Sequence, residues 1–142
     1  MLSDSLEETK KIAADFAAAL RGGEVVALEG EIGAGKTTFT QGLAAALGAE
    51  GLARSPTFTV LNVYPTSRQP IEKIIHVDVY RLRIPEDILN LGLEEWLGQP
   101  NAIVLIEWPR AVDGVEIKFD WIVQIAVGEK ENERIIEIKN PR

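Results

Sequence analysis

The sequence predicts an α/β protein of three layers, in which a mixed, largely parallel sheet lies in the middle and an antiparallel hairpin closes the C-terminal end. Residues 25–28 and 102–106 are continuous apolar runs, as in strands buried on both faces of a parallel sheet. Helical patterns precede and follow the first run, and alternating strands and helices are typical of this class. At 142 residues, a single domain over residues 1–142 is expected.

The first helix is expected to start after Ser5, because Glu8 follows three residues later as in a capping box. It should run to the Gly22–Gly23 pair. A helix is also expected over residues 36–47, since Gly48 is a typical residue just past a helix end. Further strands are predicted at residues 57–64, 74–80, 121–127 and 134–138, and a short helix at residues 85–96.

The charge balance excludes several classes of protein. The chain has 22 Asp and Glu against 15 Lys and Arg, a net charge of −7, whereas domains that hold nucleic acid on their own surface carry basic patches. It has no Cys, which excludes thiol catalysis and cysteine-ligated metal clusters. The acidic first residues do not resemble a secretory signal, and no uncharged run approaches the ~20 residues of a spanning helix. A cytoplasmic protein is expected.

Residues 30–37, GEIGAGKT, match the pattern G-x-x-x-x-G-K-[ST] at every fixed position. Glycines let consecutive backbone N–H groups turn toward phosphate oxygens, and the following helix adds its positive end. In such a loop Lys36 reaches the β- and γ-phosphates and the Thr37 hydroxyl ligates Mg²⁺. The preceding strand and following helix supply the context that the pattern requires. The alternative, a glycine-rich turn without a ligand, is much less favoured.

Two acidic residues end apolar runs. Glu107 follows residues 102–106, and Asp78 ends the run that contains His76. Nucleotide sites in α/β sheets lie at the carboxyl ends of strands, so either residue is a candidate for holding Mg²⁺ while the other orients an attacking water. The alternative for each is an acid that caps a turn. His76 by itself is more often a packed residue than a base.

Two further positions are open to more than one interpretation. Thr57, in Ser55-Pro56-Thr57-Phe58, lies where a switch-type loop would bring a hydroxyl or carbonyl toward the γ-phosphate, although a plain proline turn explains the tetrapeptide better. Trp108 either walls the nucleotide site or fills core beneath it.

In order along a chain this short, GEIGAGKTT, SPTF, HVDVYRL, LGLEEWL and IEWPR closely resemble the TsaE family, formerly YjeE. The likeness covers roughly residues 5–138. These are small bacterial P-loop ATPases required for threonylcarbamoyladenosine modification of tRNA. The resemblance implies a P-loop NTPase-type fold, slow ATP hydrolysis with Mg²⁺, and a chain that is a monomer when isolated.

The resemblance also implies protein partners, the TsaB–TsaD pair, in which TsaD transfers the threonylcarbamoyl group to an adenosine next to the anticodon. The ATPase cycle would reset that complex between rounds, and tRNA would be met only through it.

The resemblance implies roles for individual residues. Lys36, Asp78 and Glu107 would be catalytic, and Thr37 and Glu107 would hold Mg²⁺. Residues expected to contact the nucleotide are Thr9, Glu31, Ile32, Gly33, Ala34, Gly35, Lys36, Thr37, Thr38, Thr57, Trp108 and Arg134.

Two other functions remain open. A small-molecule phosphotransferase also uses a P-loop, and would recruit Arg81 and Arg83 to cover its acceptor. A nucleotide-gated binding module would hydrolyse ATP only incidentally. A GTPase is disfavoured, because the chain contains neither N-K-x-D nor D-x-x-G.

Overall fold

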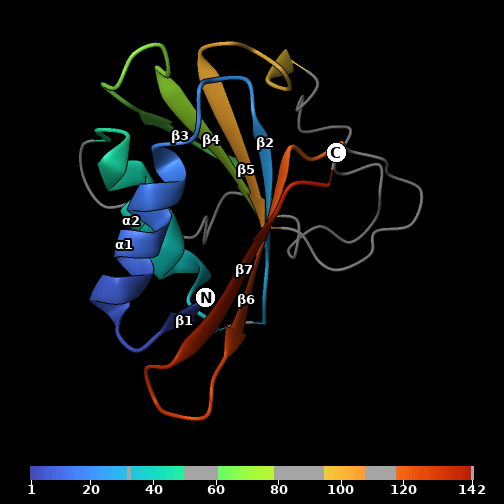
Figure 1. Ribbon diagram of the computed structural model, residues 1–142. Helices are drawn as coiled ribbons and strands as arrows, with labels where there is room; N and C mark the ends of the chain where they lie inside the picture. The colour runs from blue at the N-terminus through green and yellow to red at the C-terminus, as the bar shows by residue number, and fades with distance from the viewer. Residues whose placement is uncertain (32, 50–60, 79–94, 108–117, 142) are drawn as a thin grey trace.

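A computed structural model describes residues 1–31, 33–49, 61–78, 95–107 and 118–141. In this part of the chain, two helices accompany a mixed sheet of seven strands, ordered β1-β7-β6-β2-β5-β4-β3 (Figure 1). The predicted α/β class is confirmed. The elements are β1 (Leu2–Ser3), α1 (Leu6–Ala17), β2 (Val25–Glu29), α2 (Lys36–Ala46), β3 (Leu61–Pro65), β4 (Lys73–Asp78), β5 (Ala102–Glu107), β6 (Trp121–Val127) and β7 (Arg134–Lys139).

The centre of the sheet is parallel and its edges are antiparallel. Strand β2 pairs in parallel with β5 and β6, and β5 pairs in parallel with β4. Strand β3 runs antiparallel to β4, and β6 and β7 form the predicted C-terminal hairpin. The short strand β1, which the sequence did not predict, adds to β7 at the edge. The carboxyl ends of β2, β4 and β5 therefore meet at one end of the sheet.

Helix α1 starts as predicted. The Ser5 hydroxyl accepts from the Glu8 amide at 3.0 Å, and the Glu8 carboxylate accepts from the Asp4 amide at 2.7 Å. Its predicted end at Gly22–Gly23 is wrong, because the helix ends at Ala17. The Arg68 guanidinium donates to the carbonyls of Ala17 and Leu20 at 2.9 and 2.7 Å, which satisfies these groups outside a helix.

The helices α1 and α2 pack against each other on one face of the sheet (Figure 1). They touch at Gly42, where an added Cβ would lie 2.7 Å from the Lys10 Cα and 2.8 Å from the Lys10 carbonyl oxygen. Only glycine allows the backbones this close approach.

Each face of the sheet has its own core. Leu28, Ile74 and Leu105 face the helices, whereas Val104 and Ile106 belong to a second cluster on the opposite face. Because side chains alternate along a strand, the last residues of β4 and β5 fall on the helix face.

Parts of three predicted elements lie outside the described residues: 57–60 and 79–80 of two strands, and 85–94 of the short helix. Among the helices that the structure describes, none has the length and apolarity needed to cross a membrane.

Candidate functional site

The glycine loop joins β2 to α2 and leaves the start of the helix open. Gly33 and Gly35 have φ angles of +84° and +105°, which favour glycine. Gly35 is the N-cap of α2, so no side chain caps the helix, and its first turn contains no acidic residue. No carboxylate within the first turn competes for the positive end of the helix, which suits an anion-binding helix start.

Lys36 lies back across this loop. Its side chain is 8% exposed, and its Nζ donates to the Gly30 carbonyl at 2.6 Å. Burial lowers the pKa of Lys36, while the nearby carboxylates of Glu107 and Asp78 act to raise it. The ammonium group is thus bonded to the loop and lies within electrostatic range of two carboxylates.

Asp78 and Glu107 form a pair at the ends of β4 and β5. They lie directly opposite each other in the parallel ladder, and Glu107 is also in register with Leu28 of β2. Asp78 is 8% and Glu107 4% exposed. The fold therefore brings together the two acids and the lysine that the sequence predicted to share a site.

The residues at this end of the sheet fit a Mg²⁺ ion that takes some of its ligands from the protein and others from a bound phosphate. Among the described residues no group of three His, Asp or Glu side chains could enclose a metal. Mg²⁺ commonly binds through one or two carboxylates together with substrate phosphates, and keeps several waters. Glu107, Asp78 and the half-buried Thr37 beside Lys36 match that donor set.

Arg134 lies against the loop, and Thr9 is connected to Arg134 through Ser3. The Thr9 hydroxyl is buried and 2.7 Å from the Ser3 hydroxyl, and Ser3 pairs with Arg134 across β1 and β7. The Arg134 Nε lies 3.5 Å from where a Cβ on Gly35 would stand. This Nε is buried with no hydrogen-bond partner in the described chain, while Nη1 donates to the carbonyls of Glu131 and Glu133.

The remaining predicted contact residues are of two kinds. Glu31 and Gly33 are exposed, Thr38 is half-buried and Ala34 is buried. Three others, Ile32, Thr57 and Trp108, lie outside the described residues.

Sequence reasoning undervalued His76 and did not consider Tyr64. The imidazole is fully buried, with Nε2 3.5 Å from the Glu107 Oε2 and Nδ1 3.4 Å from the Tyr64 hydroxyl. The spacing His76-x-Asp78 was the available signal, since residues two apart on a strand share a face.

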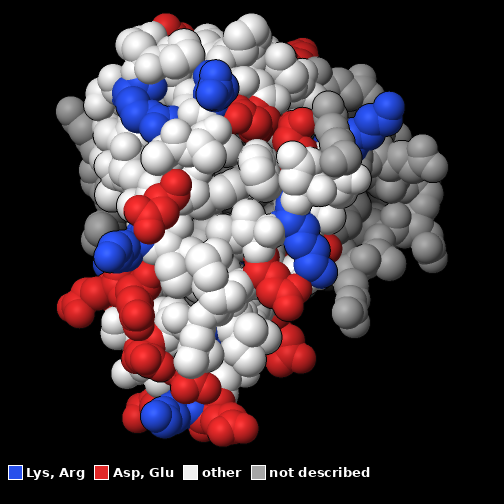
Figure 2. Space-filling view, viewed as in Figure 1, with Lys and Arg blue, Asp and Glu red and all other residues white. Residues whose placement is uncertain are grey.

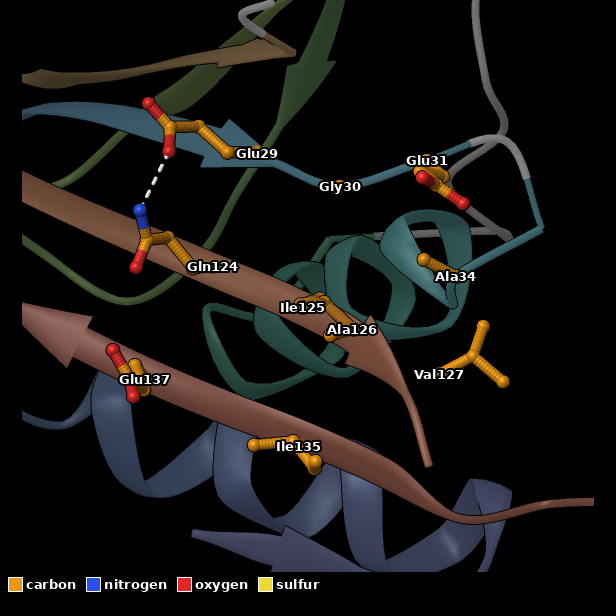
Figure 3. Close-up of a pocket in the computed structure, with 10 residues that line it drawn as sticks. All are labelled: Glu29, Gly30, Glu31, Ala34, Gln124, Ile125, Ala126, Val127, Ile135 and Glu137. Carbon is orange, nitrogen blue, oxygen red and sulfur yellow. Dashed lines mark hydrogen bonds between the residues drawn. The ribbon is translucent and has the colours of Figure 1, made fainter. Parts of the chain in front are cut away.

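A pocket of about 680 Å³ opens on the other side of the loop, between its first residues and the β6–β7 hairpin (Figure 3). Glu29, Glu31 and Glu137 line it, and Glu29 accepts from Gln124 at 2.9 Å. Neither Lys36 nor Asp78 is part of its lining. Three carboxylates make this pocket unfavourable for phosphate groups, so the Lys36 side of the loop is the better phosphate site.

A parallel strand, a glycine loop that leads into an uncapped helix, and acids at the ends of adjacent strands are the architecture of a P-loop-type α/β protein. The model of the family "Threonylcarbamoyl adenosine biosynthesis protein TsaE" matches residues 3–136. The chain belongs to the TsaE family.

Individual proteins agree with this assignment. A tRNA threonylcarbamoyladenosine biosynthesis protein TsaE of Bacillus subtilis is 43% identical over 107 residues, which cover 75% of this chain and 64% of that protein. The Aquifex aeolicus TsaE is 39% identical over 110 residues, covering 76% of this chain and 74% of that protein. A crystal structure of Bacillus subtilis YdiB superposes with a TM-score of 0.64 at 29% identity, covering 96% of this chain and 80% of that one.

Proposed function

We propose that this chain is a Mg²⁺-dependent ATPase that serves threonylcarbamoyladenosine modification of tRNA. Membership of the TsaE family supports the pathway. One observation carries the chemistry: buried Lys36 bonds to the glycine loop within electrostatic range of the carboxylates of Glu107 and Asp78, which are paired at the ends of β4 and β5. A buried ammonium group near two buried carboxylates suits phosphate bound together with a divalent cation, because the lysine attracts the phosphate and the carboxylates attract the cation.

In the proposed mechanism the chain positions ATP and stabilises charge, because phosphoryl transfer leaves little covalent chemistry to a protein. Lys36 turns from the Gly30 carbonyl to the β- and γ-phosphates. The amides at the start of α2 and the loop hold the phosphate oxygens, and Thr37 and Glu107 hold the metal. Asp78 orients the attacking water. Mg²⁺, when bound, neutralises charge on the phosphates.

Further nucleotide contacts are proposed for Thr9, Arg134, Thr57 and Trp108, with Thr57 directed toward the γ-phosphate. The position of Arg134 against Gly35, with a buried and unpartnered Nε, supports its inclusion. For Thr57 and Trp108 the support is the family resemblance alone.

We further propose that the chain works with the TsaB–TsaD pair and is slow in isolation. Its net charge of −7 fits docking on protein while that pair holds the tRNA. Figure 2 shows acidic side chains gathered over the tip of the β6–β7 hairpin, where Glu129 and Glu131 are exposed. Such a surface repels tRNA phosphates.

The fate of the γ-phosphoryl group tests the proposal. With γ-labelled ATP and Mg²⁺, we expect the label to appear as free phosphate, faster when TsaB–TsaD is added. Label on an organic acceptor would support the phosphotransferase instead, whose expected Arg81 and Arg83 lie outside the described residues. ATP-dependent binding of TsaB–TsaD without label release would support a nucleotide-gated binding module.

A further inference from the structure

A row of three polar side chains crosses the helix face of the sheet. Tyr64, His76 and Glu107 come from β3, β4 and β5, which are neighbours in the sheet. His76 is the middle member, is fully buried, and is the one histidine of the sequence. The row leads from the sheet edge to the carboxylate proposed above as a metal ligand.

His76, the middle residue of the row, lies close to both of its neighbours. The Tyr64 Oη lies 3.4 Å from the His76 Nδ1, within hydrogen-bond range. On the other side, the His76 Nε2 lies 3.5 Å from the Glu107 Oε2, yet it makes no hydrogen bond within the described residues. A buried ring nitrogen with no partner is costly, so a role for it is to be expected.

The chemistry of the three groups selects one arrangement of protons. An ionised carboxylate only accepts hydrogen bonds, so a lone pair on the His76 Nε2 would face the lone pairs of Glu107. With the proton on Nε2, Nδ1 is free to accept from the Tyr64 hydroxyl. A single tautomer therefore suits both neighbours. Glu107 selects it, because a carboxylate can only accept whereas the Tyr64 hydroxyl can either donate or accept.

We propose that His76 is a positioning residue that orients the Glu107 carboxylate, which would hold the Mg²⁺ of the nucleotide, and that Tyr64 fixes the imidazole through its contact with Nδ1. Partners of metal-ligating side chains commonly fix ligand orientation in this way. The inference rests on the proposed function, because it takes Glu107 as a metal ligand. It adds two residues, Tyr64 and His76, that would act through Glu107 without touching the nucleotide.

The test measures how ATP affinity depends on Mg²⁺, using a fluorescent ATP analogue titrated at a series of Mg²⁺ concentrations and in EDTA. For His76→Leu we expect the Mg²⁺ concentration at half-maximal effect to rise about tenfold or more, since loss of such a partner typically weakens metal affinity 10- to 100-fold. Affinity in EDTA should be unchanged. Tyr64→Phe should give a smaller rise, and His76→Gln, which keeps an N–H near Nε2, should partly restore the wild-type value.

Ile75→Val is the matched control. Ile75 is fully buried on the same strand but belongs to the cluster on the opposite face. This substitution destabilises β4 mildly and should leave the Mg²⁺ dependence unchanged. A shift with Ile75→Val as large as that with His76→Leu would overturn the inference, because general loosening of β4 would explain both. If His76→Leu fails to fold, Tyr64→Phe and His76→Gln carry the test.

The single histidine gives a second readout that is independent of activity. In the ¹⁵N spectrum of histidine-labelled protein, we expect one imidazole with a protonated Nε2 and an unprotonated Nδ1. Glu107→Gln should shift the Nε2 signal. The opposite tautomer would overturn the proposal.

The two possible failures are distinguishable. If the wild-type chain binds ATP equally with and without Mg²⁺, the proposed function fails and the inference fails with it. If the wild-type chain depends on Mg²⁺ and all three variants match it, only the role of His76 and Tyr64 is overturned.

Discussion

Asp78 and Glu107 are direct partners in the parallel ladder between β4 and β5, and each is the last residue of its strand. Nearly all of both side chains is buried, on the same face of the sheet as Lys36 and α2. The two carboxylates at the site are thus positioned by the regular part of the fold.

Removal of the Lys36 ammonium should weaken ATP binding. For Lys36→Ala we expect about a 10- to 100-fold loss of affinity, because a hydrogen bond to a charged group contributes about 1.5–3 kcal/mol. Calorimetric titration with ATP measures it. Lys11→Ala, an exposed position on α1, is the control and should bind as the wild type does. Equal affinities for the two variants would remove Lys36 from the site.

Asp78 and Glu107 should respond differently to substitution, because they are proposed to have different roles. Asp78→Asn should keep ATP affinity within a few-fold and lower the hydrolysis rate by about 10²–10⁴, the usual range for a group that assists proton transfer. Glu107→Gln should instead raise the Mg²⁺ concentration needed for binding. Single-turnover rates and Mg²⁺ titrations distinguish them. The reverse pattern would exchange the roles of the two residues.

Gly33, which lies in the glycine loop, and Gly98, which lies outside it, form a matched pair for substitution. Both have positive φ, +84° and +77°, and an added Cβ would meet nothing within 4 Å at either. Substitution by Ala should therefore cost each about 1–2 kcal/mol of unfolding free energy through backbone strain. Only Gly33→Ala should also weaken ATP binding. Denaturant unfolding and ATP titration of both variants check this, and an equal loss of affinity in Gly98→Ala would contradict it.

The close contact between α1 and α2 at Gly42 should make a Gly-to-Ala substitution there destabilising. Ala is favoured over Gly in a helix by about 1 kcal/mol, but here its Cβ would overlap the Lys10 backbone. We expect Gly42→Ala to destabilise the fold by about 1–3 kcal/mol in urea unfolding, as overpacking does. Ala45→Gly, exposed on the same helix, should cost no more than the helix propensity. A Gly42→Ala variant as stable as the wild type would refute the close packing.

Sequence patterns predicted the parts of the molecule that have a local cause. The apolar runs at Val25 and Ala102 became central parallel strands, and the capping box placed the start of α1. The end of α1 depends on Arg68, a residue about fifty positions away, so local signals could not give it. The short β1 forms only because β7 offers an edge.

The candidate site was likewise predicted from sequence only in part. The glycine pattern and the strand-end positions of Asp78 and Glu107 could be found from sequence, and the fold brings these residues together. The contact of His76 with Glu107 needed the strand order, because β5 lies far from β4 in the sequence, whereas Tyr64 and His76 come from the consecutive strands β3 and β4. Strand order is a non-local property that no single segment encodes.

ATP hydrolysis by this chain is proposed above to sustain tRNA modification. The most direct test of this proposal counts threonylcarbamoyladenosine formed per TsaB–TsaD complex, with tRNA, a threonylcarbamoyl donor and ATP supplied. We expect many rounds with the wild-type chain and a sharp fall with Lys36→Ala or Asp78→Asn. Undiminished turnover without the chain, or with both variants, would contradict it.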